Sequence, residues 1–307
     1  MTAGRLVCVT SRVSAFRKIK TGVSKSVFKA STLISPYLNT QLRFWRTTGH
    51  FVNLKNPHTF SEKISWLKLH CYASDPLVKQ CSDKLQVRDY VRTKGLEELL
   101  IPLLAVFKRP KEIVWENLPD KFVLKWNFGC GFNLLCSDKN ALKVPDAVRM
   151  LGKWGRTRYW LEFSELQYKT AKKRIICEQF LEADSDEGLV DYKFYCFHGK
   201  ALAVLAIARP PQGEKEAILM TPEWEPISDI PGRYKKSFLP DRPCSLDKMK
   251  RTAEILSQPF PFVRVDFYDC NGKPYFGEMT FTPAAGIFPS EAPLEGKSMG
   301  DYINLDI

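Results

Sequence analysis

The clearest alternation of apolar and polar positions lies near the end of the chain, in Phe262–Thr282. Two runs of strand-forming residues flank Asn271–Lys273, which suit a three-residue hairpin loop with Gly272 in the left-handed region. The pattern therefore predicts two antiparallel strands whose side chains alternate between the two faces of a sheet.

One face of this predicted hairpin is polar and acidic. With a three-residue loop, Arg264 lies opposite Glu278, and Asp266 is a diagonal neighbour of Glu278 at roughly 7–8 Å. The two-residue period places Thr280 and Thr282 on the same face. Two carboxylates this close favour a cation between them, and oxygen atoms are the ligands that Mg²⁺ prefers. The alternative is a solvated hairpin in which Arg264 pairs with Glu278, and the hairpin alone leaves both interpretations open.

Elsewhere the pattern predicts helices between groups of short strands, and hence an α+β fold with antiparallel sheets. Thr59–Glu62 has the form of a capping box that opens a helix, and Ser82 is expected to cap a second helix. This second helix is predicted over residues 83–94. The other predicted helices cover residues 24–38, 147–159 and 246–258, and the predicted strands cover 122–126, 134–136, 174–181, 191–197 and 201–208. The proline-rich stretch 210–243 is predicted to be irregular.

Composition sets the class of protein. The 307 residues are 44% hydrophobic, enough for one large or two modest domains, and no uncharged run is long enough for a transmembrane helix. Nine cysteines without C-x-x-C spacing indicate free thiols in a reducing compartment, so we expect a cytoplasmic protein.

The net charge of +12 is concentrated at the start of the chain, where no acidic residue precedes Glu62. This basic arm, residues 1–50, has several interpretations: a transit peptide, a contact with an anionic membrane surface at the inner face, attraction to a polyanion, or a solvated terminus. No RRM, KH or helix-turn-helix pattern is present, which argues against a nucleic-acid partner.

Several residues have the chemistry to bind a nucleotide. Lys125 ends an apolar strand before a loop with Gly129 and Gly131, where backbone N–H groups can approach phosphate oxygens. A tight turn with a solvated lysine is the alternative. Glu178, on an apolar strand, could accept a hydrogen bond from an adenine amino group or be an edge-strand residue facing water. Lys84 lies at a predicted helix start, where the helix dipole disfavours a cation.

Further basic groups occur at strand ends. Lys193 follows Asp191 at the start of one strand, and Arg209 ends the next. They could hold a phosphate or a carboxylate, or form surface ion pairs. No Ser/His/Asp or Cys/His arrangement is present, and Cys130 is expected to be a small packed residue.

The order of these segments resembles the ATP-grasp ligases, and more closely the TupA-like ATP-grasp family, which is associated with teichuronopeptide and other cell-surface polysaccharide biosynthesis. The last segment is similar to the R-x-D and E-x-N-T-x-P signature of D-alanine–D-alanine ligases, with Thr280 where asparagine is usual. The resemblance runs from about residue 51 to the end. Its motifs are Asn56–Lys63, Ser82–Lys84, Val123–Lys125, Glu178–Leu181, Asp191–Phe194, Phe262–Asp266 and Phe276–Pro283.

The resemblance implies an ATP-grasp fold, in which two α+β lobes with antiparallel sheets clamp ATP. The regions it implies are a basic arm (1–50), a helical pre-grasp region (51–120), a central lobe (121–181) and a C-terminal lobe with the metal-binding hairpin (182–307). In this family the glycine loop usually reads Asn-His-Gly-Ser-Gly, whereas Phe128 and Cys130 stand here in place of the imidazole and the hydroxyl.

The resemblance also implies roles for single residues. Those implied to bind ATP are Lys84, Lys125, Gly129, Gly131, Glu178, Leu181 and Asp191. Those implied to hold two Mg²⁺ ions are Asp266, Glu278 and Thr280, and those implied to surround the reacting phosphate are Arg264, Lys193 and Arg209.

The activity implied is that of an ATP-dependent carboxylate–amine ligase that works through an acyl phosphate on a cell-surface polysaccharide or its precursor. Its partners would be ATP, a carboxylate-bearing glycan or precursor, and an amine. Two alternatives stay open: an ATP-grasp kinase or glycan-transferring enzyme, and a basic, non-enzymatic protein that binds polyanions.

Overall fold

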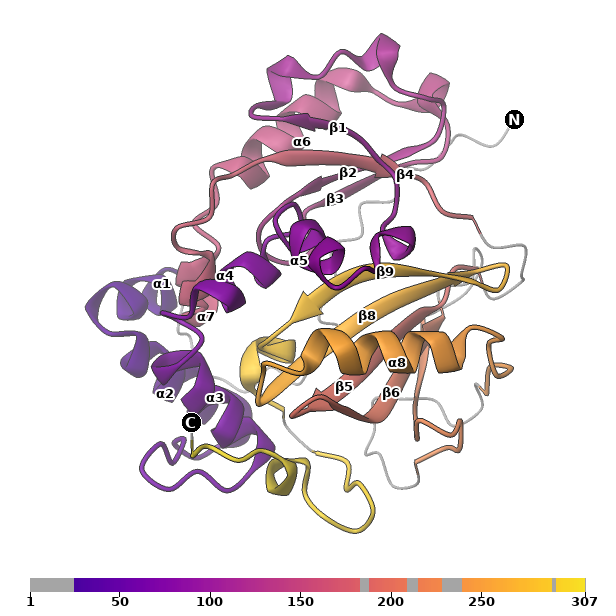
Figure 1. The fold of residues 1–307 in the computed structure, drawn as a ribbon. Helices are drawn as coiled ribbons and strands as arrows, with labels where there is room; N and C mark the ends of the chain where they lie inside the picture. The colour runs from indigo at the N-terminus through magenta and orange to yellow at the C-terminus, as the bar shows by residue number, and fades with distance from the viewer. Residues whose placement is uncertain (1–24, 183–187, 209–214, 228–238, 289–290, 307) are drawn as a thin grey trace.

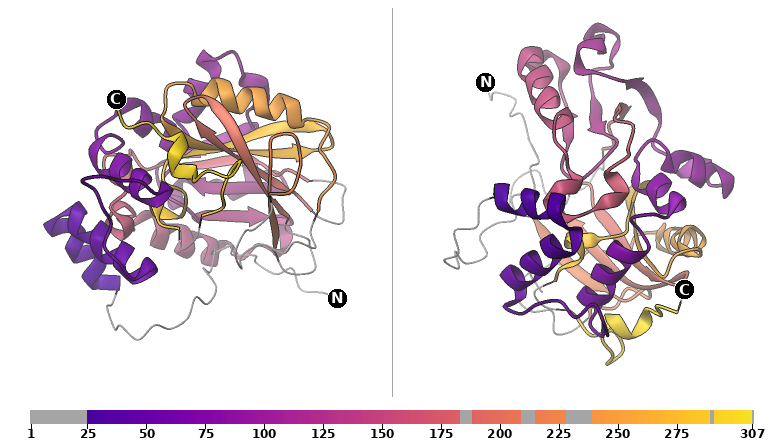
Figure 2. Two further views of the ribbon diagram at one scale, coloured as in Figure 1. Left: turned by 90° about the horizontal axis from the view of Figure 1, so that it is seen from below. Right: turned by 90° about the vertical axis from the view of Figure 1, so that its left-hand side faces the viewer.

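Two antiparallel β-sheets, each covered by a helix on one face, form the frame of the molecule (Figure 1). The computed structural model describes residues 25–182, 188–208, 215–227, 239–288 and 291–306. The smaller sheet lies above the larger one, and the helices from the first third of the chain run along one side, as the side view in Figure 2 shows. The predicted α+β class with antiparallel sheets is confirmed.

The smaller sheet has four strands in the order β1-β4-β2-β3. Its strands are β1 Leu103–Phe107, β2 Phe122–Trp126, β3 Asn133–Cys136 and β4 Ile175–Gln179. In β2 the side chains alternate between buried and half-buried. The buried side packs under α6 (Val144–Gly155), where the Trp126 indole N–H donates to the carbonyl of Leu151 at 3.0 Å. The opposite side of the sheet carries Lys125 and Glu178 beside the apolar Val123, Leu135 and Ile176.

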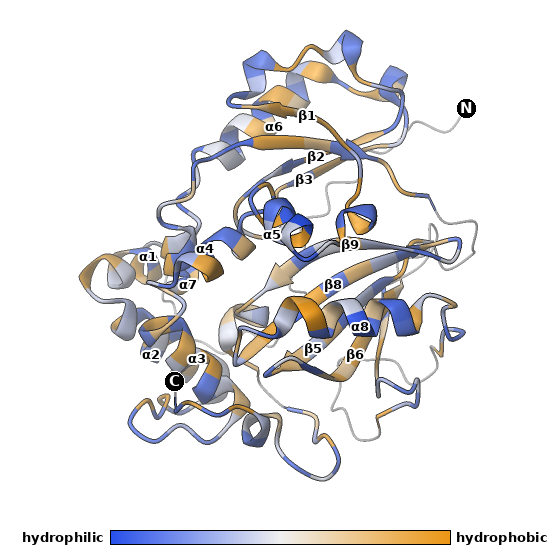
Figure 3. Cartoon of the chain, viewed as in Figure 1, coloured by the Kyte–Doolittle hydropathy of each residue, from blue (hydrophilic) through white to orange (hydrophobic). Residues whose placement is uncertain are grey.

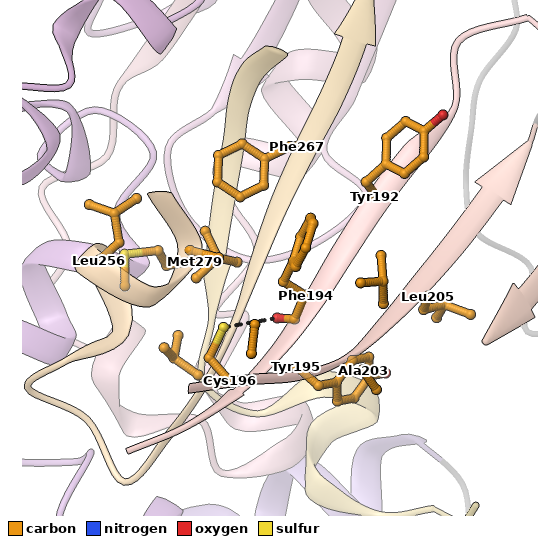
Figure 4. Close-up of a cluster of buried hydrophobic side chains, with 14 of the residues drawn as sticks. Tyr192, Phe194, Tyr195, Cys196, Ala203, Leu205, Leu256, Phe267 and Met279 are labelled. Carbon is orange, nitrogen blue, oxygen red and sulfur yellow. Dashed lines mark hydrogen bonds between the residues drawn. The ribbon is translucent and has the colours of Figure 1, made fainter. Parts of the chain in front are cut away.

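The larger sheet has five strands in the order β7-β6-β5-β8-β9. Its strands are β5 Asp191–Phe197, β6 Lys200–Ala208, β7 Glu216–Met220, β8 Phe262–Cys270 and β9 Lys273–Thr280. Helix α8 (Leu246–Ser257) covers one face, and Figure 4 shows Leu256 of this helix beside Met279, with Phe194 and Phe267 in the same buried cluster. Strand β7 was not predicted, because it lies within the proline-rich stretch.

The hairpin β8–β9 corrects the predicted register. Its loop has two residues, Asn271 (φ 54°) and Gly272 (φ 80°), and Cys270 pairs with Lys273. Positive φ at both positions is the type I′ geometry that matches the twist of the strands. A bulge follows, because Gly277 has no partner opposite it.

The two-residue turn and the bulge together change the predicted pairing between the two strands. Asp266 lies directly opposite Glu278, and Arg264 lies opposite Thr280. The predicted diagonal pair is therefore a direct cross-strand pair. The prediction that these residues share one face of the sheet is confirmed, since paired residues of adjacent strands point to the same side.

Most of the helices precede the first sheet. They are α1 Lys25–Ile34, α2 Pro36–Thr48, α3 Phe60–His70, α4 Pro76–Ser82 and α5 Val87–Thr93, with α7 Trp160–Phe163 further along. Short 3₁₀ turns are η1 Glu97–Leu99, η2 Pro110–Glu112, η3 Trp115–Asn117, η4 Lys139–Ala141, η5 Leu166–Tyr168, η6 Pro283–Gly286 and η7 Met299–Tyr302. The capping box at Thr59 and Glu62 is confirmed. The predicted cap at Ser82 is wrong: Ser82 ends α4, and Asp83 instead accepts the backbone N–H groups of the next turn.

The end of the chain is packed against the start of α3. A Cβ atom on Gly300 would lie 2.3 Å from the carbonyl oxygen of His58 and 2.7 Å from the nitrogen of Phe60. Both are backbone atoms of the helix cap, so neither can move aside easily. The close approach therefore fixes the chain end on the same helix that carries the capping box.

We expect Gly300→Ala to destabilise the protein by about 1–3 kcal/mol, because the added methyl group overpacks a rigid backbone contact. Gly152→Ala in α6 is the matched control. Its Cβ would meet only the flexible end of Arg156 at 4.0 Å, and alanine is the better helix former there. Urea denaturation measures both variants, and equal midpoints for the two would contradict the packing described here.

Candidate active site

Charged side chains from the two sheets lie close together, because Lys84 and Lys125 both lie near the Glu278 carboxylate. Lys125 and Glu178 come from the smaller sheet, and Asp266 and Lys193 come from the larger one. Burying several charged groups together destabilises the fold unless the charges pair with one another or bind a ligand.

The acids of β8 and β9 are held by cations. The Arg264 guanidinium donates to both carboxylate oxygens of Asp266 at 2.7 Å, and the Lys193 ammonium reaches Asp266 at 2.6 Å. Glu278 lies 3.7 Å from Arg264, and Thr280 donates to Glu278 at 3.4 Å. Burial lowers the pKa of Arg264, but the charge of Asp266 and the hydrogen bonds to it outweigh burial and raise that pKa above its usual range. Burial raises the pKa of Glu278. The lysines and Arg264 outweigh this effect and lower the pKa of Glu278.

Lys84 connects the two sheets. It lies in the turn between α4 and α5, and its backbone N–H donates to the carbonyl of Asn127 at 2.9 Å. Its ammonium donates to the carbonyl of Gly129 in the glycine loop at 2.6 Å and lies 3.5 Å from the Glu278 carboxylate. One side chain therefore contacts the glycine loop of the smaller sheet and the carboxylate hairpin of the larger sheet.

Glu178 is buried in a central strand, since β4 lies between β1 and β2. Its carboxylate accepts from Lys125 at 2.7 Å and from Arg88 of α5 at 3.2 Å. The edge-strand interpretation of Glu178 is therefore wrong. The carboxylate is fixed by two cations at the edge of the space between the sheets.

The glycine loop has the backbone that its glycines require. Gly129 and Gly131 have φ of 68° and 79°, and a Cβ on Gly129 would lie 2.7 Å from the ring of Tyr159. Phe128 is buried with the apolar residues under α6, away from solvent, whereas Cys130 is exposed. The expectation that Cys130 is a packed residue is wrong. The eight described cysteines form no disulfide.

Three further positions were predicted for the site, and one of them lies beside the same charged cluster. Asp191 is buried on β5, and its carboxylate lies 3.6 Å from the Lys193 ammonium. Leu181 follows β4 by two residues and is half-buried. Arg209 lies outside the described residues.

The donor set for a divalent cation consists of oxygens. Asp266, Glu278 and Thr280 offer carboxylate and hydroxyl groups on one face of the hairpin, which fits Mg²⁺. Among the described residues, no group of three or more histidines, cysteines and acids could form a metal site by itself. A bound ion would therefore need further ligands, such as phosphate oxygens or water.

Sequence reasoning missed several buried polar residues beside the site. The carboxylate of Asp83 accepts from the Asn127 side chain at 2.6 Å, which ties the turn before Lys84 to the start of the glycine loop. The available signal for Arg88 was its position four residues after Lys84 in a predicted helix, on the same side. No local pattern marked Asp83–Asn127, because the two residues meet only through the fold.

A second missed group lies under the hairpin. Glu165 is buried and accepts from Thr282, and burial raises its pKa. Lys68, 1% exposed, donates to the carbonyls of Phe163 and Ala285 at 3.2 and 3.3 Å. Burial lowers the pKa of Lys68 to about 8, although Glu165 opposes this shift. These groups support the segments on both sides of the candidate site.

Comparisons with known proteins give one extensive match. A model of the family described as TupA-like ATP-grasp matches residues 62–304. A comparison with curated proteins found no match.

The solved structures that match the chain at low identity include ligases and a synthetase. D-alanine–D-alanine ligase from Bacillus anthracis, complexed with ATP, has a TM-score of 0.43 and 13% identity over 66% of this chain and 56% of its own. The L-amino acid ligase from Bacillus licheniformis has a TM-score of 0.40 and 16% identity over 68% of this chain and 42% of its own. D-cycloserine synthetase has a TM-score of 0.40 and 14% identity over 82% of this chain and 86% of its own. The chain thus spans little more than half the length of the first of these structures.

The buried Lys68 predicts a pH-dependent stability. Below pH 8 the Lys68 ammonium is charged in both the folded and the unfolded protein. Between pH 8 and 10.5, the ordinary pKa of a lysine, only the unfolded chain keeps the proton. Wild-type stability should therefore rise relative to Lys68→Met across this range, by about 3 kcal/mol. Urea unfolding of both proteins from pH 7 to 10.5 measures the difference, and a constant difference would contradict the shifted pKa.

Proposed function

We propose that this chain, which belongs to the TupA-like ATP-grasp family, is an ATP-dependent ligase that joins a carboxylate to an amine. The observation that supports this best is the position of Lys84, which contacts both the glycine loop and Glu278. A triphosphate placed between the sheets would meet lysines, backbone N–H groups and carboxylates within one space.

In this proposal the nucleotide lies along the edge of the smaller sheet. Lys84, Lys125 and the loop at Gly129 and Gly131 bind the phosphates. Glu178 and the backbone near Leu181 hold the adenine, and Asp191 lies near the ribose. The ion pairs that Lys84 and Lys125 form with acids in this structure would be exchanged for contacts with phosphate oxygens, which are strong partners for ammonium groups.

Asp266, Glu278 and Thr280 would hold Mg²⁺, with two ions as the expected number. The charge balance supports this assignment. The three acids Asp191, Asp266 and Glu278 are matched by three cations that contact them, Lys84, Lys193 and Arg264. A nucleotide triphosphate adds negative charge to this balanced set, so divalent cations entering with it restore neutrality. The ions would supply charge neutralisation on the phosphates.

The chain then contributes electrostatics and positioning. A carboxylate oxygen of the substrate forms a bond to the γ-phosphorus, and the bond from the γ-phosphorus to the bridging oxygen breaks, releasing ADP. An amine then attacks the acyl carbon, phosphate leaves with the C–O electron pair, and the amine nitrogen loses a proton. Arg264, Lys193 and, outside the described residues, Arg209 are proposed to stabilise the charge that develops on the transferred phosphoryl group. No protein nucleophile is required.

The substrate is proposed to be a carboxylate-bearing cell-surface polysaccharide or its precursor. This rests on the family, whose resemblance points to polysaccharide biosynthesis. Carboxylates on a sugar chain, such as those of uronic acids, supply the acyl group that the reaction needs.

We further propose that the protein is cytoplasmic and touches the inner membrane face through α1 and α2. Of the thirteen exposed large apolar side chains in the described residues, seven lie between Val27 and Phe51. Leu33 and Ile34 are 63% and 76% exposed, and Figure 3 shows apolar colour on α1 at one end of the molecule. The segment also carries no acid. Lys29 and Arg43 of these helices pair with Glu162 of α7, so the protein balances part of the basic charge. Exposed apolar groups beside basic residues are typical of contacts with anionic lipid. No helix in the described part of the chain is long and apolar enough to cross a bilayer.

The ligase proposal predicts the behaviour of two hairpin variants. Asp266→Asn and Glu278→Gln should each lower the rate of ADP release by at least about 100-fold, because each removes charge from the phosphate and metal site. The assay supplies ATP, Mg²⁺, a uronic acid and an amine, and measures ADP. Glu223→Gln, at an exposed ion pair with Lys250 on the outer side of the larger sheet, is the matched control and should keep full activity.

Hydroxylamine separates the ligase from a kinase. A ligase that forms an acyl phosphate yields a hydroxamate when hydroxylamine replaces the amine. A phosphorylated hydroxyl product without hydroxamate would contradict the ligase and support the kinase.

The membrane proposal predicts co-sedimentation with vesicles that contain phosphatidylglycerol, and little with phosphatidylcholine alone. Leu33→Glu combined with Ile34→Glu should weaken binding at least about tenfold, since two apolar contacts are lost and like charges are added. Val114→Glu with Leu239→Glu, also at exposed apolar positions, is the control. The proposal is contradicted if the Leu33→Glu, Ile34→Glu variant binds the vesicles as the wild type does. It is also contradicted if this variant changes self-association without changing vesicle binding.

A further inference from the structure

A hollow of about 510 Å³ lies beside the proposed ATP site, between α4, η5 and the start of β4. Its volume falls within the range of about 300–1,000 Å³ that is typical of small-ligand sites. The proposed nucleotide site does not use the residues whose side chains line it. Its chemistry therefore indicates what else the protein could bind.

The hollow is positively charged. Lys79, Lys172 and Arg174 line it, and within the described part of the chain none of the three forms an ion pair. Among the described residues, the Lys79 ammonium donates to the backbone carbonyl of Ser74, and the Arg174 guanidinium donates to that of Lys173. Among the residues that the structure describes, no carboxylate therefore pairs with these three cations.

The one acid in the lining does not cancel this charge. Asp83 is buried, and its carboxylate accepts from Asn127, from the Gln86 side chain and from the backbone N–H groups of Leu85 and Gln86. Both carboxylate oxygens of Asp83 therefore already accept hydrogen bonds from residues that line the hollow. An anionic ligand would meet the three cations without facing an unpaired acid.

The hollow also offers amides and an aromatic ring. Gln80 and Gln167 line it together with Tyr168. Gln167 is buried, and its amide nitrogen donates to the Thr282 hydroxyl at 3.4 Å. Its amide oxygen has no hydrogen-bond partner among the residues that the structure describes. A buried acceptor left without a donor is costly unless a ligand or water supplies one. Sugar hydroxyls are donors, and an aromatic ring can pack on a sugar ring.

The hollow shares a wall with the proposed ATP site. Asp83 precedes Lys84, and Asn127 precedes the glycine loop, so the hydrogen bond between Asp83 and Asn127 separates the two spaces. A polymer seated in the hollow would therefore lie next to the place where phosphates are proposed to bind. The reacting carboxylate and the carboxylate held here would belong to different units of the same chain.

We propose that this hollow binds a carboxylate-bearing sugar unit of the acceptor. The proposal rests on the ligase function put forward above and extends it, because it assigns a separate subsite for an acidic glycan. The three cations would pair with the carboxylate, and Gln167 would accept from a hydroxyl group. A neutral glycan lacks the carboxylate and would lose these charged contacts.

Isothermal titration of the full chain with a short oligoglucuronate tests the proposal, with a neutral oligoglucose of equal length as the comparison ligand. The double variant Lys172→Gln, Arg174→Gln should raise the Kd for the oligoglucuronate at least about tenfold, because two charge-assisted contacts are lost. Lys108→Gln with Lys111→Gln, at exposed positions near the far end of the smaller sheet, should bind as the wild type does.

Titration with ADP and Mg²⁺ in the same proteins separates the two proposals. Unchanged ADP binding in the double variant, together with weakened oligoglucuronate binding, supports the subsite. The subsite is overturned if the two oligosaccharides bind equally well, or if both double variants bind the oligoglucuronate equally well. Complete displacement of the oligoglucuronate by inorganic phosphate would also overturn it. Wild type that binds ADP but not oligoglucuronate contradicts the subsite alone, whereas failure to bind ADP contradicts the ligase proposal.

Discussion

The arrangement of the site depends on one electrostatic constraint: Asp266 and Glu278 face each other across two paired strands, and cations must balance them. Arg264 and Lys193 hold Asp266 from the same sheet, whereas Lys84 reaches Glu278 from the turn beside the other sheet. Side-by-side acids within a sheet repel each other unless opposite charges lie close. The need to balance these acids thus helps to hold the two sheets together, and in the proposed function the same cations would exchange acids for phosphates.

The sequence predicted much of the fold and the identity of the acids, because both follow local rules. Alternation placed Arg264, Asp266, Glu278 and Thr280 on one face, and the capping box predicted the start of α3. The register was missed because a two-residue turn and the bulge at Gly277 together shift the pairing, and the two features are hard to distinguish from a three-residue loop by pattern alone.

What the sequence did not predict depends on contacts between distant segments. Glu178 became a central-strand residue only because β1 and β2 both pair with β4, an order that local patterns do not specify. The same holds for the buried pair Asp83–Asn127 and for Glu165 with Thr282. Phe128 and Cys130 depart from the usual glycine loop, and the structure gives the physical outcome. Phe128 joins the core under α6, and Cys130 is exposed. In the proposed function, the backbone N–H groups of the loop are therefore the groups that would bind a phosphate.

The central claim is that a triphosphate with divalent cations lies between the two sheets at the carboxylate hairpin. A crystal structure with a non-hydrolysable ATP analogue and Mn²⁺ in place of Mg²⁺ tests it most directly, because Mn²⁺ gives an anomalous signal. We expect an anomalous peak at about 2.0–2.3 Å from oxygens of both Asp266 and Glu278, with the phosphates beside Lys84. A nucleotide bound away from these residues, or an ordered analogue with no peak between the two acids, would contradict the account.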